Sequence, residues 1–283
     1  ALMNGARLGI AAQSVGLSQA AYNEGLAYAR DREQFGKAII EMPAVYDMLA
    51  TIKAKLDAGR ALLYHCARAV DVYKVLEDIS RERKLTAEER AEMKAYNKLA
   101  DSLTPLAKGM NSEYCNQNTY DALQIHGGSG FMMDYPIQRY ARDARITSIY
   151  EGTTQLQVVA AIRFVMNGAY LSHLRELEQQ EVSAEMKELQ VRARKMADAF
   201  EVAVERVKAA GVQEYQDLCA RHLVEMAADT LMLHLLTYNA THAPELFSKS
   251  ARVYARYAAA EVEKHLVFVN ELSPEDLEAY RQV

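Results

Sequence analysis

One carboxylate, Glu151, stands between an apolar run and a Gly-Thr-Thr turn in the segment ITSIYEGTTQLQ (146–157). A carboxylate beside the first turn of a helix stabilises the positive end of that helix, and this electrostatic role is the simplest interpretation of Glu151. A carboxylate can instead act as a general base if its site shields it from water, because a hydrated carboxylate is a weak base. Tyr150 and the apolar residues before it could contribute such shielding.

Two further segments contain residues suited to binding an anionic ligand. In YARDREQFGKAI (28–39), Arg32 carries a forked set of donors that matches paired phosphate oxygens, although a surface salt bridge is the plainer role of an arginine. In QIHGGSGF (124–131), three glycines permit positive φ and let backbone N–H groups approach a ligand. A glycine-rich helix end is also an ordinary C-cap, so both interpretations of this segment stay open.

Helices must position these groups, because the composition favours helix almost everywhere. The chain has only five Pro and thirteen Gly among 283 residues, so few positions break a helix. It is rich in Ala, Leu, Glu, Lys and Met, which lose little rotamer freedom in a helix, and no strand pattern competes. The predicted fold class is therefore all-α.

The clearest helix follows Pro43, which suits a first helical position. Apolar or small residues then recur at alternating spacings of four and three: Val45, Leu49, Ile52, Leu56, Gly59, Leu63, Cys66 and Val70. Such a stripe is typical of a helical bundle, and Gly59 would let a neighbouring helix approach closely. After Asp71 the pattern decays into mostly charged residues, where we expect a solvated connection between helices.

A second long helix begins at Thr86, where the Thr hydroxyl and Glu89 form a capping-box pattern. Its expected buried face consists of Tyr96, Leu99, Leu103, Leu106 and Met110. After the glycine-rich segment, Pro136 suits the first turn of another helix, and Thr153 caps a helix that runs to about Met166. The Gly-Thr-Thr turn therefore precedes a helix start.

From about Ser172 onward the chain shows amphipathic helices but no convergent set of reactive residues. Three helices separated by Gly211 and by the segment THAP (241–244) are expected, and Ser273 with Asp276 opens a short final helix. The apolar stripe of this part must be buried, either within the chain or between subunits; it consists of Leu223, Ala227, Leu231 and Leu235. We interpret its Met, Leu and Tyr residues as core rather than as cofactor contacts.

Charge and cysteine content argue against several classes of partner. The formal net charge is −5 with both signs interspersed, so the chain lacks the basic stripe of a nucleic-acid-binding protein. Three widely spaced cysteines, Cys66, Cys115 and Cys219, predict buried thiols rather than disulfides or metal ligands, as is typical of a reducing cytoplasm. No apolar run approaches the roughly 18 residues of a membrane span. The chain starts within a helical pattern, and we expect a further N-terminal part before Ala1.

Read together, the three segments around Arg32, the glycines and Glu151 resemble the C-terminal helical domain of the acyl-CoA dehydrogenase family. The resemblance covers roughly Met3 to Arg163 and rests on three motifs in the family's order. It implies a bundle of the up-and-down four-helix type over residues 1–171. Residues 172–283 resemble the helical extension appended to larger bacterial members of the family.

The resemblance also implies a reaction. In the family, a carboxylate directly before Gly-Thr removes a proton from the carbon beside an acyl-CoA thioester carbonyl, which assigns the catalytic role to Glu151. The β-carbon then passes a hydride to FAD, and the backbone N–H of the same glutamate polarises the thioester carbonyl. Gly152 would leave room for the substrate, and Arg7 aligns with a family arginine near the base and the acyl-CoA. A surface salt bridge is the alternative for Arg7.

FAD contacts are implied at two groups of positions. The family's Arg-x-x-Phe-Gly pattern assigns Arg32 to the FAD pyrophosphate and Phe35 to the cofactor of a neighbouring subunit. Three residues of the glycine-rich segment would contact the adenosine diphosphate part of a partner's FAD; they are Gln124, Gly127 and Gly128. Thr153 and Gln155 would lie along the FAD of their own subunit. His126 is expected to pack rather than to react.

One departure from the family pattern puts a flavin contact in doubt: Pro43 stands where many members carry a glutamine. The family also places the flavin ring between this helical domain and preceding domains, so the chain is expected to be inactive alone. The implied enzyme is a cytoplasmic acyl-CoA dehydrogenase of fatty acid β-oxidation that passes electrons to an electron-transfer flavoprotein. It would be a homo-oligomer, a dimer or tetramer, shaped by the extension. The alternatives are an acyl-CoA oxidase and a non-catalytic helical module.

Overall fold

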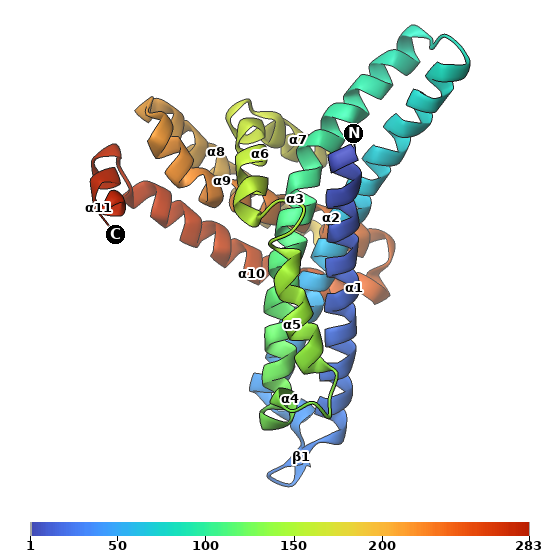
Figure 1. Ribbon diagram of the computed structural model, residues 1–283, viewed down its shortest axis with the longest axis vertical. Coiled ribbons are helices and arrows are strands. Elements are labelled where there is room, and N and C mark those ends of the chain that lie inside the picture. The colour runs from blue at the N-terminus through green and yellow to red at the C-terminus, as the bar shows by residue number, and fades with distance from the viewer. Residues whose placement is uncertain (1, 283) are drawn as a thin grey trace.

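The computed structural model describes residues 2–282, which form eleven α-helices, three short 3-10 helices and one two-stranded hairpin (Figure 1). The helices are α1 (Leu2–Asp31), α2 (Pro43–Glu82), α3 (Ala87–His126), α4 (Gly128–Phe131), α5 (Ile137–Thr147), α6 (Thr154–Met166), α7 (Ala169–Leu177), α8 (Lys187–Ala210), α9 (Gln213–His242), α10 (Pro244–Glu271) and α11 (Leu277–Arg281). The hairpin pairs β1 (Glu33–Gln34) with β2 (Lys37–Ala38), and the 3-10 helices are Ile39–Glu41, Ala184–Met186 and Pro274–Asp276. The predicted all-α fold is confirmed.

The long axis of the molecule is a bundle of α1, α2 and α3, with α5 packed along α3 and α1 (Figure 1). The predicted stripe of α2 is its buried face from Leu49 onward, with Val45 half-buried at its start. At Gly59 the bundle is too tight for any side chain, because a Cβ there would lie 2.2 Å from the Asn111 Oδ1 of α3. The close approach predicted at Gly59 is thus present, and Asn111 donates to the Gly59 carbonyl at 3.2 Å.

The charged segment after Asp71 is helical, so the predicted solvated connection there was wrong. α2 continues to Glu82, because residues spaced three and four apart pair along its surface, as Arg81 does with Glu77 at 3.6 Å and with Asp78 at 2.8 Å. Only the four residues 83–86 connect α2 to α3. Both hydrogen bonds of the predicted capping box at the start of α3 are present.

A small hairpin, which the sequence pattern did not predict, occupies the lower end of the bundle (Figure 1). Phe35 and Gly36 form its turn with φ of +52° and +77°. Positive φ at both central residues fits the right-handed twist of a tight hairpin, but a bulky residue such as Phe rarely adopts it. Phe35 is nonetheless 87% exposed, so the strained residue projects its ring into solvent.

The second part of the chain packs across the bundle rather than beside it (Figure 1). α9 and α10 contact α2, and α6 contacts α9, so one main hydrophobic core is continuous from α1 to α10. The three predicted helices are α8, α9 and α10, and Gly211 ends α8 in a left-handed conformation. The stripe that begins at Leu223 is buried within the chain itself, so these residues do not form a contact between subunits.

The cysteines and hydropathy agree with expectation. Cys66, Cys115 and Cys219 are free and buried. Burial raises the pKa of the Cys66 thiol to about 11 and that of the Cys115 thiol to about 12, so both are inert at neutral pH. No helix between residues 2 and 282 combines the length and the apolar character needed to cross a membrane.

Candidate active site

The candidate base lies in the loop that joins α5 to α6. Thr153 caps α6 by accepting a hydrogen bond from the Leu156 N–H at 3.4 Å, as predicted. The Thr154 N–H donates to the Ser148 carbonyl at 3.0 Å and so closes the loop around Glu151. The sequence therefore folds here into a tight turn directly before a helix N-terminus.

Glu151 and Gly152 form the centre of this turn with φ of +55° and +93°. For a glutamate the left-handed region costs roughly 1–2 kcal/mol, and such strained residues cluster at functional sites. Gly152 is required by the turn itself, because a Cβ would lie 2.8 Å from the Gln157 Nε2 in addition to the positive φ. Room for a substrate is therefore not the only reason for a glycine at this position.

Two side chains beneath the turn hold its carbonyl groups. The Gly152 carbonyl accepts hydrogen bonds from the Lys108 ammonium at 2.8 Å and from the Gln157 amide at 2.9 Å. The Gln157 amide also reaches the Glu151 carbonyl at 3.4 Å. Lys108 was not predicted from the sequence, although a lysine between Leu106 and Met110 on the expected buried face of α3 was a signal.

Arg7 also lies at this turn. Its guanidinium comes within 3.9 Å of the Cβ position that a side chain at residue 152 would have. Its Nε is buried and has no hydrogen-bond partner in the described part of the chain, where Arg7 also forms no salt bridge. The surface salt bridge considered for Arg7 is thus absent, and the arginine has an unused donor beside the candidate base.

The neighbours of Glu151 do not shield it from solvent within the described residues. Glu151 is exposed, as are Ile146 and Ile149 of the preceding apolar run, and the Tyr150 hydroxyl is hydrogen-bonded to Gln13. Within residues 2–282, the Glu151 carboxylate forms no hydrogen bond or ion pair. The carboxylate therefore faces outward, and any exclusion of water from it must come from groups outside this chain.

The second group of predicted residues lies at the far end of the bundle. The predicted phosphate ligand, Arg32, is exposed before the hairpin, and its nearest polar partner is the neutral Gln34 Oε1 at 3.3 Å. The glycine-rich segment at the end of α3 lies near the same end of the bundle. There the His126 ring of α3 stacks on the Tyr28 ring of α1, with 4.3 Å between the ring centroids. His126 is buried, as predicted, and its Nδ1 is bonded to the Ala122 carbonyl at 2.7 Å.

Three residues of the glycine-rich segment are open to a ligand at that end. Gln124, Gly127 and Gly128 are exposed, and a Cβ at either glycine would meet nothing within 4 Å. Gly127 has a φ of +57°, so it is both the C-cap of α3 and a position that favours glycine. The ordinary C-cap role is observed, and the segment is also accessible.

The predicted site residues therefore form two groups rather than one. Arg7, Glu151, Gly152, Thr153 and Gln155 surround the turn before α6, whereas the other group surrounds the hairpin. From Arg7 to Asp31, α1 covers a distance of about 36 Å at 1.5 Å per residue. One bound molecule at the turn is thus well separated from one at the hairpin.

The donor set of each group fits part of a dinucleotide. Arg32 forms no ion pair with a carboxylate among the described residues, so its forked donors remain available to paired phosphate oxygens. Thr153 and Gln155 lie at the N-terminus of α6, where backbone N–H groups and the helix dipole favour an anionic or polar ligand. The residues present thus suit FAD, divided between two sites.

A cavity of about 400 Å³ adjoins the turn, and Thr153 and Gln155 line it. Arg145 of α5 and Arg221 of α9 also line it, so the second part of the chain contributes to its wall. Arg221 is paired with Glu225 at 2.7 Å. The two predicted cofactor contacts therefore face a polar hollow at the contact of α6 with α9.

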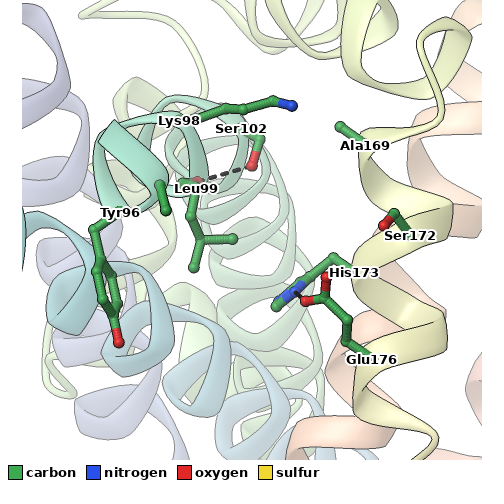
Figure 2. A pocket seen from close by; sticks show the side chains of 9 residues that line it. Tyr96, Lys98, Leu99, Ser102, Ala169, Ser172, His173 and Glu176 are labelled. Atoms are coloured by element: carbon green, nitrogen blue, oxygen red, sulfur yellow. Dashed lines mark hydrogen bonds and ion pairs between the residues drawn. The ribbon is translucent and has the colours of Figure 1, made fainter. Parts of the chain in front are cut away.

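A different cavity, of about 340 Å³, lies between α3 and α7 and contains none of the predicted site residues (Figure 2). His173 lines it and shares a hydrogen bond of 2.9 Å with His65 behind it. Burial, together with the neighbouring His173, lowers the pKa of His65 to about 4, so His65 is neutral at pH 7. Glu151 does not line this cavity, so we do not assign it to the candidate active site.

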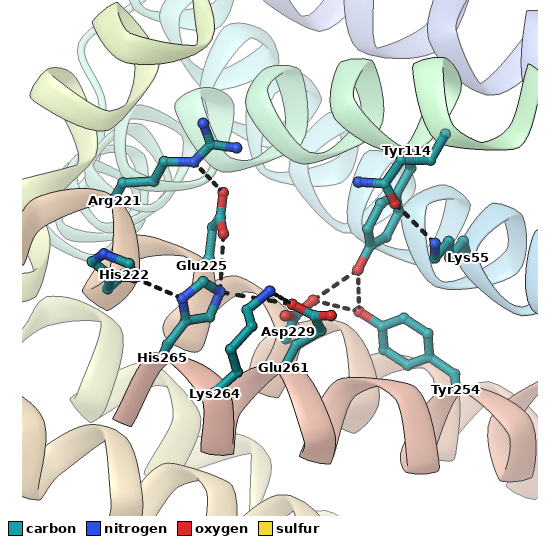
Figure 3. A network of polar contacts seen from close by, with 11 residues as sticks. Lys55, Tyr114, Arg221, His222, Glu225, Asp229, Tyr254, Glu261, Lys264 and His265 are labelled. Atoms are coloured by element: carbon teal, nitrogen blue, oxygen red, sulfur yellow. Dashed lines mark hydrogen bonds and ion pairs between the residues drawn. The ribbon is translucent and has the colours of Figure 1, made fainter. Parts of the chain in front are cut away.

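A buried polar network that the sequence did not predict joins the two parts of the chain (Figure 3). The Tyr114 and Tyr254 hydroxyls donate to Oδ1 of the Asp229 carboxyl group at 2.7 and 3.0 Å, and Glu225 pairs with His265 at 3.0 Å. Burial raises the pKa of Asp229 to about 7, against the opposing effect of the tyrosine hydrogen bonds. Tyr114 is separated by 115 residues from Asp229, so no local pattern could reveal the contact.

Comparisons with known proteins match both parts of the chain. Residues 1–166 match the family model described as acyl-CoA dehydrogenase, C-terminal domain, and residues 166–277 match a model described as acyl-CoA dehydrogenase C terminal. The caffeyl-CoA reductase-Etf complex subunit CarC of Acetobacterium woodii is 38% identical over 151 residues, 53% of this chain and 34% of that protein. An acyl-CoA dehydrogenase of Bacillus subtilis is 34% identical over 166 residues, 59% of this chain and 38% of that protein.

The fold matches a solved structure over nearly the whole chain. The crystal structure of an acyl-CoA dehydrogenase complexed with FAD from Bacillus anthracis has a TM-score of 0.75 at 22% identity. The match covers 94% of this chain and 48% of that one. This chain thus spans about a third of the length of the curated relatives and about half of the solved structure.

Proposed function

Because the chain belongs to the acyl-CoA dehydrogenase family, we propose that it is the helical part of a flavoprotein that oxidises acyl-CoA thioesters to trans-2-enoyl-CoA. One observation carries the proposal. Glu151 is held in a strained left-handed conformation at a helix N-terminus with its carboxylate exposed and unpaired within the described residues. A glutamate that only stabilised the helix would not need this conformation.

The turn can perform two tasks on a bound thioester. The Glu151 carboxylate would accept the proton from the carbon next to the carbonyl. The Glu151 N–H forms no hydrogen bond within the described chain, so it is free to donate to the thioester oxygen and stabilise the charge that develops there. Arg7, with its unused buried donor, would lie beside the acyl-CoA.

FAD, when bound, would accept the hydride from the β-carbon. Thr153 and Gln155 would hold the cofactor of the subunit that contains the base. Arg32, Phe35, Gln124, Gly127 and Gly128 would hold the cofactor of a neighbouring subunit, since they lie at the other end of α1. Exposure of the strained Phe35 supports this, because a bulky residue with positive φ and a free ring is typical of a contact surface.

We propose two partners, one from this arrangement and one from the name of a relative. A cofactor shared across subunits requires a homo-oligomer, so we propose that the enzyme is at least a dimer. The Acetobacterium woodii relative is named as a subunit of an Etf complex, and we propose an electron-transfer flavoprotein as the electron acceptor here. The same relative is named a reductase, and a turn that accepts an α-proton can return it, so reduction of an enoyl-CoA is the second candidate function.

An anaerobic titration of the flavoprotein that contains this chain tests the proposal. Saturated acyl-CoAs of several chain lengths should bleach the flavin absorbance in a one-to-one ratio, and the bleached enzyme should reoxidise slowly in air. Rapid reoxidation would identify an acyl-CoA oxidase instead. If the saturated thioester does not bleach the flavin, but an enoyl-CoA reoxidises flavin that has first been reduced chemically, the enzyme is a reductase. A protein without flavin would identify a non-catalytic helical module.

A further inference from the structure

Lys108 occupies an unusual position for a lysine. Its side chain comes from the middle of α3 and is fully buried, at 0% exposure, beneath the turn that carries Glu151. A buried ammonium is unfavourable unless a specific partner receives it. Its hydrogen bond is to the Gly152 carbonyl at 2.8 Å, which is a backbone atom of the strained turn rather than a carboxylate.

The hydrogen bonds from Lys108 and Gln157 fix the orientation of the turn. Both donors approach the Gly152 carbonyl from the interior, and Gln157 also contacts the Glu151 carbonyl. With the carbonyls held inward, the glutamate side chain is left on the outer surface, where it is exposed. Without these donors, nothing else in the described chain bonds to the Gly152 carbonyl, and relaxation of the left-handed residues would be favourable.

We propose that Lys108 is a positioning residue: its buried ammonium locks the Glu151–Gly152 turn so that the Glu151 carboxylate points toward the substrate side. Gln157 assists on the same carbonyl. That the carboxylate acts on a substrate rests on the proposed function, whereas the locking of the turn does not.

Charged groups around Lys108 make the lock dependent on pH. Burial lowers the pKa of Lys108 to about 8; the Glu113 and Glu151 carboxylates favour its charged form, and the Arg7 guanidinium opposes it. The ammonium is therefore mostly protonated at pH 7 and loses its proton as the pH rises through about 8. Above that pH the Gly152 carbonyl loses its charged donor.

Selective isotope labelling can observe this carbonyl directly. In this chain Gly152-Thr153 is the only Gly-Thr step, so carbonyl-¹³C glycine combined with ¹⁵N threonine gives one correlated NMR signal. We expect its carbonyl shift to titrate with a midpoint near pH 8. The titration should vanish in Lys108→Met and persist in the control Lys55→Met, which removes another buried lysine, bonded to Gln117 at 2.8 Å. Persistence of the titration in Lys108→Met, or an identical carbonyl shift at pH 6 in Lys108→Met and in the unsubstituted chain, would overturn the proposal.

Two further measurements cover failure of a variant to fold and separate the lock from the reaction. Gln157→Leu keeps the ammonium, so the pH titration should remain while amide exchange of residues 151–156 accelerates; unchanged exchange would contradict the inward-locking geometry. In the flavoprotein, Lys108→Met should slow flavin reduction by about tenfold or more with little change in acyl-CoA affinity, as expected for loss of a charge-assisted hydrogen bond. If Glu151→Gln leaves flavin reduction unaffected while the NMR result holds, the proposed base is wrong and the lock stands.

Discussion

Replacing Asp229 with Asn should change how the stability of the fold depends on pH. Asp229 is 2% exposed and accepts hydrogen bonds from Tyr114 and Tyr254, so it connects α9 to α3 and α10. Burial raises its pKa from 3.8 to about 7. The folded chain therefore keeps the carboxyl protonated between about pH 4 and pH 7, whereas the unfolded chain loses the proton.

The sign and size of the effect follow from this difference. Where the folded state binds more protons, the free energy of unfolding falls as the pH rises. The stabilisation from Asp229 is fully present below pH 3.8 and is lost as the pH rises to about 7. At about 1.4 kcal/mol per pH unit, the loss across the window amounts to roughly 4 kcal/mol.

The free energy of unfolding can be measured at pH 4.5, 5.5, 6.5 and 7.5 by urea unfolding followed by far-UV circular dichroism. Asn cannot ionise, so the pH-dependent loss of stability that comes from Asp229 should be absent in Asp229→Asn. The free energy of unfolding of Asp229→Asn, relative to that of the unsubstituted chain, should therefore rise by several kcal/mol from pH 4.5 to pH 7.5. The control Asp217→Asn alters an exposed residue of the same helix and should run parallel to the unsubstituted chain. Parallel curves for Asp229→Asn as well would refute the reasoning.

Three other predictions concern packing, histidine and the cofactor. Gly59→Ala should destabilise the chain by about 1–3 kcal/mol in urea unfolding, because its Cβ has no space. The control Gly16→Ala, in open surroundings, should stabilise the chain by about 0.5–1 kcal/mol. Equal effects of the two substitutions would contradict the close approach of α3 to Gly59. Because burial lowers the pKa of His65 to about 4, the free energy of unfolding should fall as the pH falls from about 6.5 to 4. In His65→Gln this decrease should be smaller by roughly 3 kcal/mol. An unchanged decrease in His65→Gln would contradict the role of His65. In the flavoprotein, Arg32→Ala should weaken both FAD retention and subunit association, measured by absorbance after dialysis and by light scattering, whereas the exposed neighbour Arg30→Ala should spare both.

Local patterns in the sequence were sufficient for most of the helices. The four-and-three spacing of α2, the capping box at Thr86 and the cap at Thr153 are each set by residues within a few positions, and all three are present. The charged end of α2 was misread because salt bridges along a helix surface support a helix that has no apolar stripe. The hairpin was missed because it consists of two residues per strand, too few to show alternation.

The candidate site was only partly predictable. Glu151 stands out from its immediate neighbours, but its conformation depends on Lys108, which lies 44 residues from the Gly152 carbonyl it binds. The network around Asp229 depends on contacts between helices that are far apart in sequence. Such contacts follow from how the second part of the chain crosses the bundle, and the amphipathic pattern of single helices does not specify that crossing.

The most direct test of the central claim is the rate of flavin reduction in the full flavoprotein with Glu151→Gln, measured anaerobically after mixing with acyl-CoA. The amide keeps the shape of the carboxylate and cannot accept the α-proton, so FAD should stay bound while reduction slows by at least about 100-fold. The control Glu92→Gln, an exposed carboxylate on α3, should reduce flavin at the normal rate. A normal rate in Glu151→Gln would show that the base lies elsewhere and would contradict the proposed role of this turn.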